Sequence, residues 1–348
     1  MKIRHSRVIV TGGAGFIGSH LVDRLLDVDN EVLVIDDFSS GSWNNLAQHR
    51  SNARLQVEEA DILDEQLMRR LHHGSQFVFH LATRNVRLSL LQPTIVHEVN
   101  TTGTLNILKA AAAAGVKGFL YCSSSEVNGT AVQVPMTEDY HFRPETIYGA
   151  SKLAGEYYTQ VFQRSGWLKT VIARPHNNYG PREHYAGILG EVIPRFILLA
   201  LAGKAPIIFG DGKQTRDFTY VTETADFLVR LLESDEAVGV TFNICRGEEV
   251  SISEIAGLII NLVNPSLVPQ YLPNRPGDVL RLCGDPTRLR LTLGSSPSIS
   301  ILAGLKETVA WFRRQVPHAP EVLADLQAKN WTMVEAEPWM PSAAEKGK

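Results

Sequence analysis

Three observations predict an α/β fold for this chain of 348 residues. Short apolar runs alternate with stretches of helical periodicity through the first half. A glycine-rich turn directly follows the first apolar run, and loops carrying Gly and Pro become frequent after about residue 176. Such alternation favours β-α-β units, so we expect a doubly wound parallel sheet with helices on both faces, followed by a smaller C-terminal lobe.

The expected elements follow one another in order along the first half. Strands are predicted at residues 7–10, 31–35, 55–57, 77–81, 118–121 and 171–173, where β-branched, aliphatic and aromatic residues cluster. Helices are predicted at residues 17–26, 65–72 and 93–114, and the third should end at Gly115, a typical helix stop. Beyond residue 176 the β-α rhythm loosens, which predicts the second lobe.

Composition and charge exclude several classes of protein. Apolar residues make up 44% and charged residues 20%, as in an ordinary globular protein, and the formal net charge is −3. A nucleic-acid or membrane-surface binder should carry a basic excess, and no apolar run approaches the ~18 residues of a spanning helix. The N-terminus lacks an apolar signal region, and the three cysteines show no paired spacing, so neither a disulfide framework nor a metal site is expected. These features predict a cytoplasmic enzyme that binds neither nucleic acid nor membrane.

The glycine-rich turn has the residues of a dinucleotide-binding loop. Gly12, Gly15 and Gly18 suit a tight turn, close approach to a pyrophosphate, and close packing of the following helix on the strand. Asp36 ends the second strand, where an acid would hold the adenosine ribose diol and repel a 2′-phosphate. Asp61-Ile62, after the third strand, suits the adenine edge. We therefore predict a Rossmann-type sheet that binds NAD rather than NADP.

A second group of residues suits proton transfer. Tyr148 and Lys152 are four residues apart, so both side chains lie on one face of a helix. The lysine ammonium would favour the phenolate of a tyrosine that normally titrates near ~10, and it could also bind the nicotinamide ribose. Ser124 follows the fifth strand at its carboxyl end, where α/β sites form, and could hydrogen-bond a hydroxyl during its oxidation. These three residues predict an active site beside the cofactor.

Together these segments resemble the extended short-chain dehydrogenase/reductase family, and within it the NAD-dependent nucleotide-sugar epimerases and dehydratases. The resemblance covers roughly residues 7–315 and includes the segment Arg-Pro-His-Asn-Asn-Tyr-Gly-Pro at residues 174–181. It implies that Ser124, Tyr148 and Lys152 form the catalytic triad. It also implies that NAD is the cofactor and that a nucleotide-diphosphate sugar is the substrate.

The motifs and the resemblance assign roles to further residues. The expected cofactor contacts are Gly12, Gly15, Phe16, Ile17, Gly18, Asp36, Asp61, Ile62, Leu81, Ala82, Tyr148, Lys152 and Pro175. The expected substrate contacts are Arg84, Arg87, Ser125, Asn177, Arg216, Arg275 and Asp278. Residues 1–177 would form mainly the NAD-binding domain, and residues 178–316 mainly the sugar-nucleotide lobe, with some segments returning to the sheet. Residues 317–348 would form a partly mobile extension. Family members commonly pair through the helices beginning near Pro93 and Thr146, so a homodimer is expected.

The resemblance leaves several reactions open. They share hydride transfer from the sugar C4 to NAD⁺, with Tyr148 taking the hydroxyl proton. Epimerisation returns the hydride to the other face, dehydration needs an acid–base pair, and decarboxylation needs a 6-carboxylate. Glu126 is a catalytic candidate for dehydration or decarboxylation, but position 125 is Ser and not the Asp of many sugar 4,6-dehydratases. We therefore favour C4 epimerisation, keep the 4,6-dehydratase and the uronate decarboxylase as alternatives, and regard a non-enzymatic NAD-binding scaffold as the distant one.

Two further departures from the family bear on the sugar pocket. Asn128 stands where a tyrosine is usual, which would make one wall of the pocket more polar. Arg84 and Arg87 follow the fourth strand, where family members usually carry smaller or uncharged residues. Two guanidinium groups there would suit a uronate carboxylate or an extra phosphate on the sugar. In the alternative interpretation, one arginine reaches solvent and the other pairs with an acid.

Overall fold

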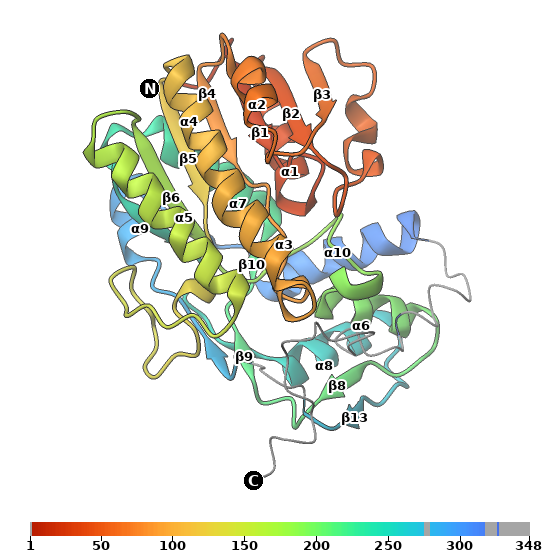
Figure 1. The fold of residues 1–348 in the computed structure, drawn as a ribbon. Coiled ribbons are helices and arrows are strands. Elements are labelled where there is room, and N and C mark those ends of the chain that lie inside the picture. Colours follow the sequence, from red (N-terminus) through yellow and green to blue (C-terminus); the bar gives the residue numbers. More distant parts are fainter. Residues whose placement is uncertain (1, 275–278, 317–325, 327–348) are drawn as a thin grey trace.

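A computed structural model describes residues 2–274, 279–316 and 326. Its centre is a seven-stranded sheet in which all neighbouring strands are parallel (Figure 1). In spatial order the strands are β11 Thr241–Ile244, β6 Thr170–Pro175, β5 Gly118–Cys122, β4 Phe77–His80, β1 Arg7–Thr11, β2 Glu31–Asp36 and β3 Leu55–Glu59. The order of the strands changes direction at β1: β2 and β3 follow on one side of it, and β4, β5 and β6 follow on the other. In α/β sheets, ligands bind at the carboxyl ends of the strands at such a point. The predicted α/β fold with a parallel sheet is confirmed.

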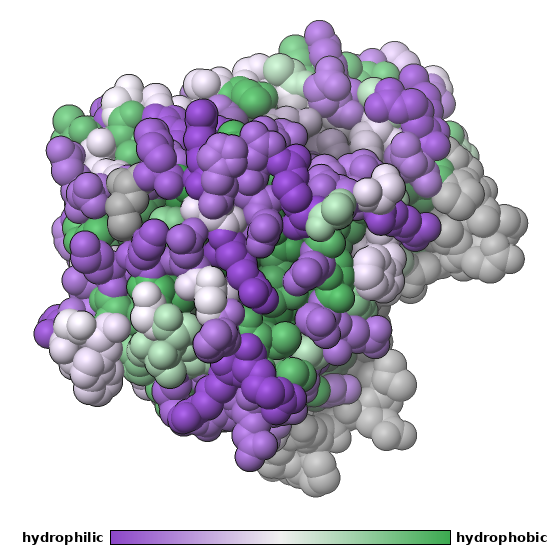
Figure 2. Space-filling model, turned by 90° about the horizontal axis from the view of Figure 1, so that it is seen from above, coloured by the Kyte–Doolittle hydropathy of each residue, from purple (hydrophilic) through white to green (hydrophobic). Residues whose placement is uncertain are grey.

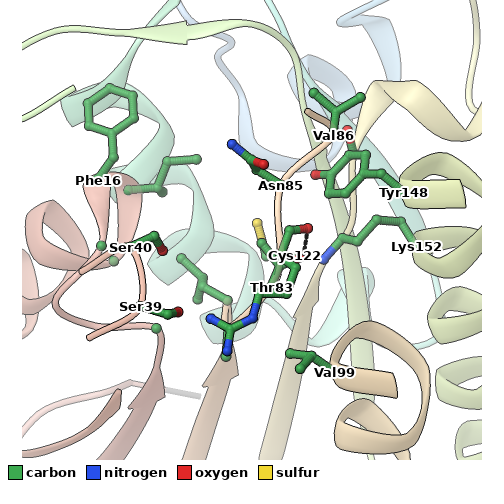
Figure 3. A pocket seen from close by; sticks show the side chains of 18 of the residues that line it. Phe16, Ser39, Ser40, Thr83, Asn85, Val86, Val99, Cys122, Tyr148 and Lys152 are labelled. Carbon is green, nitrogen blue, oxygen red and sulfur yellow. Dashed lines mark hydrogen bonds between the residues drawn. The ribbon is translucent and has the colours of Figure 1, made fainter. Parts of the chain in front are cut away.

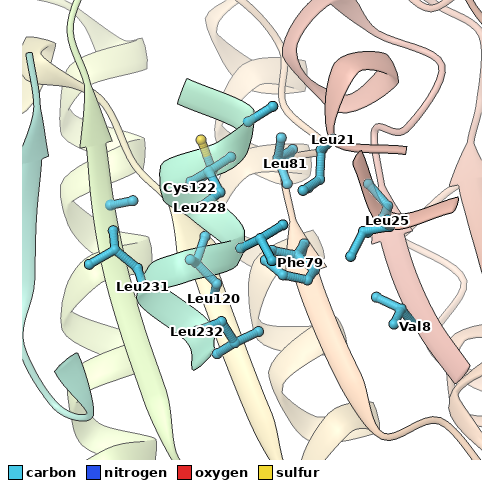
Figure 4. Packing of buried hydrophobic residues seen from close by; sticks show 14 of the residues in the cluster. Val8, Leu21, Leu25, Phe79, Leu81, Leu120, Cys122, Leu228, Leu231 and Leu232 are labelled. Atoms are coloured by element: carbon cyan, nitrogen blue, oxygen red, sulfur yellow. The ribbon is translucent and has the colours of Figure 1, made fainter. Parts of the chain in front are cut away.

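Helices cover both faces of this sheet. One face carries α1 Phe16–Leu26 and α7 Val221–Glu233, and the other carries α2 Glu65–His72, α4 Thr104–Ala114 and α5 Ile147–Arg164. On the first face Leu21 and Leu25 of α1 and Leu228 of α7 pack with Phe79 of β4 in one buried cluster (Figure 4). Because both faces are buried, the central strands are continuously apolar instead of alternating, which is why short apolar runs predicted them.

The helix expected at residues 93–114 is divided into three segments. They are α3 Pro93–His97, a π-helical segment Glu98–Gly103, and α4 Thr104–Ala114. The prediction of one regular helix was wrong in this detail, because a π-helical turn keeps the chain helical and leaves no break in the sequence pattern. Within this segment the buried Asn100 accepts the Arg84 backbone N–H and donates to the Ser151 hydroxyl, which links the loop after β4 to α5. Gly115 ends α4 with a φ of 66°, as its position predicted.

The second half of the chain divides between the sheet and a smaller lobe. β11, α7 and α9 Thr287–Leu293 return to the parallel sheet, and the remaining elements form the lower part of Figure 1. The helices and short strands of this lobe are α6 Val192–Leu201, α8 Ile252–Val263, α10 Ile301–Gln315, β7 Asn178–Tyr179, β8 Ile207–Phe209, β9 Thr215–Arg216, β10 Thr219–Tyr220, β12 Val250–Ser251, β13 Gln270–Leu272 and β14 Arg281–Leu282. The three helices enclose a separate core around Ile197, Ile259 and Phe312. The extension expected at residues 317–348 lies outside the described residues except for Leu326, which is buried in this core.

Polar residues cover most of one face of the molecule (Figure 2). The face seen in Figure 2 is largely hydrophilic, with apolar residues in smaller patches. Exposed large apolar side chains include Leu105 on α4 and Tyr157 and Val161 on α5, two helices that lie side by side (Figure 1). In the part of the chain that the structure describes, no helix has both the length and the apolar character needed to cross a membrane.

Candidate active site

A pocket of about 340 Å³ lies at the carboxyl ends of the central strands. Figure 3 shows Phe16, Ser39 and Ser40 on one side of it, and Tyr148 and Lys152, which project from α5, on the other. The residues predicted for cofactor binding and catalysis that line it are Gly12, Gly15, Phe16, Ile17, Gly18, Asp36, Asp61, Ile62, Leu81, Ala82, Ser124, Glu126, Tyr148, Lys152 and Pro175. The structure therefore brings both predicted groups together around one cavity.

Two glycines at the turn from β1 into α1 leave no room for a side chain. Gly12 has a φ of +70°, which L side chains rarely adopt, and a Cβ there would lie 2.7 Å from the backbone nitrogen of Ala82. A Cβ at Gly18 would collide with the carbonyl oxygen of Gly12. The N-terminus of α1 lines the pocket, and its N-cap Gly15 provides no side-chain acceptor. Backbone N–H groups and the positive end of the helix dipole at this wall suit a phosphate.

Asp36 ends β2 at the same edge of the pocket. Its Oδ2 accepts the Ala14 N–H and its Oδ1 accepts the Phe38 N–H, each at 2.9 Å. Burial raises the pKa of the Asp36 carboxyl, and the two backbone donors oppose that rise. A carboxylate has about four acceptor positions, so two remain for a ribose diol. The donor and acceptor set of this half of the pocket fits a dinucleotide with a free 2′-hydroxyl.

Replacing Asp36 with Asn tests this assignment. We expect the affinity for NAD to fall roughly 10–150-fold, because a charge-assisted hydrogen bond to the ribose is worth ~1.5–3 kcal/mol. The affinity for NADP should fall less, because the repulsion of the 2′-phosphate disappears. Titration with each cofactor gives the ratio of the NAD and NADP dissociation constants. A disturbed loop at Ala14 would weaken the binding of both cofactors equally and leave this ratio unchanged. An unchanged ratio would remove Asp36 from this role.

Ser124, Tyr148 and Lys152 lie together on the opposite side of the pocket. Tyr148 and Lys152 are one turn apart near the start of α5, whose N-cap is Thr146. Burial raises the pKa of Tyr148 above its usual value near 10, and a hydrogen bond with the Ser124 hydroxyl opposes this rise. Burial lowers the pKa of Lys152 to about 8, so at neutral pH the side chain remains mainly an ammonium. The Lys152 ammonium lies 4.7 Å from the centroid of the Tyr121 ring, one turn of α5 away from Tyr148.

Two carboxylates lie near the Tyr148 hydroxyl. Glu126 follows Ser124 in a short helical turn, and Glu191 directly precedes α6 in the second lobe. Both residues line the pocket. Burial is the largest cause of the raised pKa of Tyr148, and the negative charges of these two residues add to it. Acid groups from two different segments therefore line the same pocket as Tyr148 and oppose the ionisation of its phenol.

The other predicted substrate residues divide into three groups. Asn177 and Ser125 line the pocket, and Oδ1 of Asn177 is buried with no hydrogen-bond partner among the described residues. A buried acceptor of this kind is costly unless a ligand donates to it. Arg216 lies in β9, does not line the pocket, and donates to a neighbouring backbone carbonyl. Arg275 and Asp278 lie outside the described residues.

Arg84 and Arg87 are paired with carboxylates from other segments. Nη2 of Arg84 lies 2.6 Å from Oδ2 of Asp37, just beyond β2 in the cofactor half. Nη1 and Nη2 of Arg87 lie 2.7 and 2.8 Å from the two carboxylate oxygens of Glu191, and Arg87 itself does not line the pocket. Binding of an anionic sugar by Arg84 and Arg87 stays a prediction, with both guanidinium groups already paired in this structure. The alternative in which one of them reaches solvent was wrong, since the two side chains are only 13% and 12% exposed.

Sequence reasoning gave no role to several residues that line the pocket, and it placed Asn128 at the pocket wrongly. Asp37, His184 and Glu191 line the cavity but belong to no motif. An acid just before a helix has an ordinary explanation in the helix dipole, so the pattern contains no signal that would single out Glu191. Asn128 does not line the pocket, because its carboxamide donates to the backbone carbonyls of residues 140 and 141.

The sheet and the pocket have the arrangement of an extended short-chain dehydrogenase/reductase. The chain belongs to the NAD dependent epimerase/dehydratase family, whose model matches residues 8–245. This assignment confirms the resemblance inferred from the motifs, and it identifies the chain as a member of a family of NAD-dependent enzymes.

Relatives within this family catalyse different reactions. The chain is 37% identical over 312 residues to a UDP-glucose 4-epimerase of Mycolicibacterium smegmatis, covering 89% of this chain and 99% of the relative. It is 34% identical over 322 residues to UDP-glucuronic acid decarboxylase 2 of Arabidopsis thaliana, covering 91% of this chain and 70% of the relative. A solved structure of UDP-glucose 4-epimerase with UDP-glucose from Thermotoga maritima is similar with a TM-score of 0.84 and 34% identity, covering 89% of this chain and 100% of that chain.

Proposed function

We propose that this protein is an NAD-dependent 4-epimerase of UDP-hexoses. The observation that carries the proposal is the position of Ser124, Tyr148 and Lys152 in one pocket with a dinucleotide loop. The similarity to the UDP-glucose 4-epimerase of Mycolicibacterium smegmatis supports the choice of reaction and nucleotide. Ser125 supports it as well, because the position offers no carboxylate for the acid–base pair that dehydration needs.

The residues of the cofactor half fit NAD. The loop at Gly12 and the N-terminus of α1 would hold the pyrophosphate, and Asp36 would hold the adenosine ribose. Arg84 is the one arginine among the described pocket-lining residues, and its pairing with Asp37 makes it a poor partner for a 2′-phosphate. When bound, NAD supplies the hydride acceptor and donor for the sugar C4.

Side chains of the chain itself would handle the proton. Tyr148 accepts the proton of the C4 hydroxyl as that carbon is oxidised, and returns it after the sugar has turned its other face to the cofactor. Lys152 favours the phenolate through its positive charge, and the Ser124 hydroxyl donates to the same sugar oxygen. Asn177, whose buried Oδ1 has no partner in the part of the chain that the structure describes, would accept a hydrogen bond from the substrate. Each of these side chains acts by position and charge.

Product masses from nucleotide sugars incubated with the enzyme and NAD test the proposed reaction. An unchanged mass with inverted C4 supports the epimerase. Loss of water identifies a 4,6-dehydratase, and loss of carbon dioxide identifies a decarboxylase. Either loss as the main outcome would overturn the proposal.

A 4,6-dehydratase is the second candidate, because Glu126 lines the pocket near Tyr148. Replacing Glu126 with Gln separates the two reactions while keeping the size of the side chain. In an epimerase we expect only a modest fall in turnover, since the C4 proton passes through Tyr148. In a dehydratase, loss of the acid–base group should cost about 10²–10⁴-fold at the elimination step, and a 4-keto sugar should accumulate. Accumulation of that ketose, seen by mass and by carbonyl trapping, would favour the dehydratase.

We also propose that the protein forms a homodimer through α4 and α5. The exposed apolar side chains Leu105, Tyr157 and Val161 on these neighbouring helices support this. Exposed apolar groups gathered on two packed helices are typical of an interface with another protein surface.

A further inference from the structure

The loop from β7 into α6 contains an arginine in an unusual backbone conformation. Arg182 has a φ of 67°, in the left-handed region that residues other than glycine seldom adopt. Its side chain is only 11% exposed, and a guanidinium is rarely buried unless it is paired. Contacts with other segments therefore have to compensate for the backbone conformation and for the burial of the charge.

The compensating contacts come from the cofactor half of the molecule. Nη1 of Arg182 donates to the backbone carbonyl of Asn45 at 2.9 Å, and Nη2 donates to the carboxylate of Asp23 on α1. Nη2 also lies 2.7 Å from Nδ1 of His20, on the same helix. The guanidinium therefore joins this loop of the second lobe to α1 and to the segment that follows β2.

The contact with His20 defines how its imidazole is protonated. Because a guanidinium can only donate, Nδ1 of His20 must accept, and Nε2 carries the hydrogen that it donates to the carbonyl of Pro181 at 2.9 Å. Burial, followed by the positive charge of Arg182, lowers the pKa of His20 to about 4, so the ring is neutral at pH 7. α1 thus holds two consecutive residues of the loop, Pro181 by its carbonyl and Arg182 by its side chain.

The part of the loop beyond this anchor lines the pocket. His184 and Glu191 are both lining residues, and the Glu191 N–H donates to the His184 carbonyl at 2.8 Å, which closes the chain between them. The Glu191 carboxylate is held in turn by the guanidinium of Arg87. Residues 180–191, the strap, are therefore fixed to α1 at one end and to the loop after β4 at the other.

We propose that Arg182 and Arg87 are positioning residues, which hold the two ends of the strap and keep the substrate side of the pocket preformed. The inference rests on the proposed function for the sugar nucleotide that it involves. With one anchor removed, the strap loses order in the free enzyme and must be ordered when the sugar nucleotide binds, which weakens binding. Once the substrate is bound, Tyr148 and Ser124 act as before, so turnover from the bound state is retained.

Arg182→Met in the full chain loaded with NAD tests this inference. We expect the KM for UDP-glucose to rise about 10–100-fold, as for loss of a charge-assisted hydrogen bond, with kcat within about threefold of wild type. The NAD dissociation constant should also stay within about threefold, because the predicted NAD contacts at Gly12 and Asp36 lie outside the strap. An unchanged KM, or a fall in kcat as large as the rise in KM, would overturn the inference.

Two further variants separate the anchor from other effects. Arg182→Gly keeps a left-handed backbone without strain and removes the guanidinium, so the anchor predicts the same rise in KM as in Arg182→Met. Arg24→Met is the matched control, since Arg24 also lies on α1 but pairs with Asp226 of α7 at 3.0 Å. A wild-type KM in Arg182→Gly, or an equal rise in Arg24→Met, would contradict the role of the guanidinium.

Amide hydrogen exchange gives a test that needs no substrate. In the NAD-loaded enzyme we expect faster exchange in peptides covering residues 180–191 for Arg182→Met and for Arg87→Met, with wild-type exchange in β1 and β4. If the wild-type enzyme does not convert UDP-glucose, the proposed reaction fails, and hydrogen exchange then decides the inference separately. Faster exchange confined to the strap would support it, and unchanged exchange there would overturn it.

Discussion

Replacing Tyr148 with Phe should abolish most turnover and preserve NAD binding. The hydroxyl is the group proposed to move the C4 proton, and loss of a positioned proton-transfer group costs about 10²–10⁴-fold in rate. The ring should still pack at the start of α5, so the cofactor half of the pocket, on the opposite side in Figure 3, keeps its shape. Steady-state rates with UDP-glucose and an NAD titration give the two quantities.

Tyr157→Phe provides the control for this experiment. Tyr157 lies on the same helix but is 47% exposed and lines no part of the pocket. Its hydroxyl should therefore be dispensable for turnover. Near-wild-type activity of Tyr148→Phe, or an equal loss in Tyr157→Phe, would remove Tyr148 from the proposed proton transfer.

Replacing Glu156 with Ala should destabilise the fold by about 3–5 kcal/mol, because it leaves a buried guanidinium without its carboxylate. Glu156 of α5 and Arg174 of β6 are each 1% exposed, and both bonds of their bidentate pair are 2.7 Å long. The third contact of Arg174, to the carbonyl of Glu138, cannot neutralise its charge. For a chain of this length the apparent melting temperature should fall by roughly 4–7 °C.

Two further variants show whether the unpaired charge causes this loss. A double variant, Glu156→Leu with Arg174→Met, removes both charges and should recover much of the stability, since apolar replacement of a buried pair is often neutral. Glu65→Ala breaks exposed pairs with Arg69 on α2 and with Lys109 on α4, and it should cost no more than about 1 kcal/mol. A double variant as unstable as Glu156→Ala would indicate that lost packing dominates.

Sequence reasoning predicted the local parts of the site because backbone requirements and helical period govern them. Gly12 is required by a left-handed backbone and by close approach to Ala82, both of which follow from a strand–turn–helix unit. Tyr148 and Lys152 meet because four residues make about one helical turn. Asp36 lies at the pocket because a residue that ends a parallel strand next to β1 must lie at that edge.

The hydrophobic periodicity of the sequence did not predict the π-helical segment at residues 98–103. Helical periodicity continues through it, so the pattern contains no sign of a change in helix type. Asn100 bonds to the backbone of Arg84 and to the hydroxyl of Ser151, on two other elements. These bonds join three segments that are far apart in the sequence, and a local sequence pattern does not predict such contacts.

The sequence by itself determined the sheet, the dinucleotide loop and the Ser124, Tyr148 and Lys152 set. Tertiary structure alone decided which carboxylate neutralises which arginine: Arg84 pairs with Asp37, 47 residues away, and Arg87 pairs with Glu191, 104 residues away. The physical reason is that an ion pair, unlike a helix or a strand, requires no regular spacing of its residues along the chain. An arginine can bind any acid that folding brings within about 3 Å, so the pairing of Arg87 depends on how the loop after β4 packs against the loop before α6.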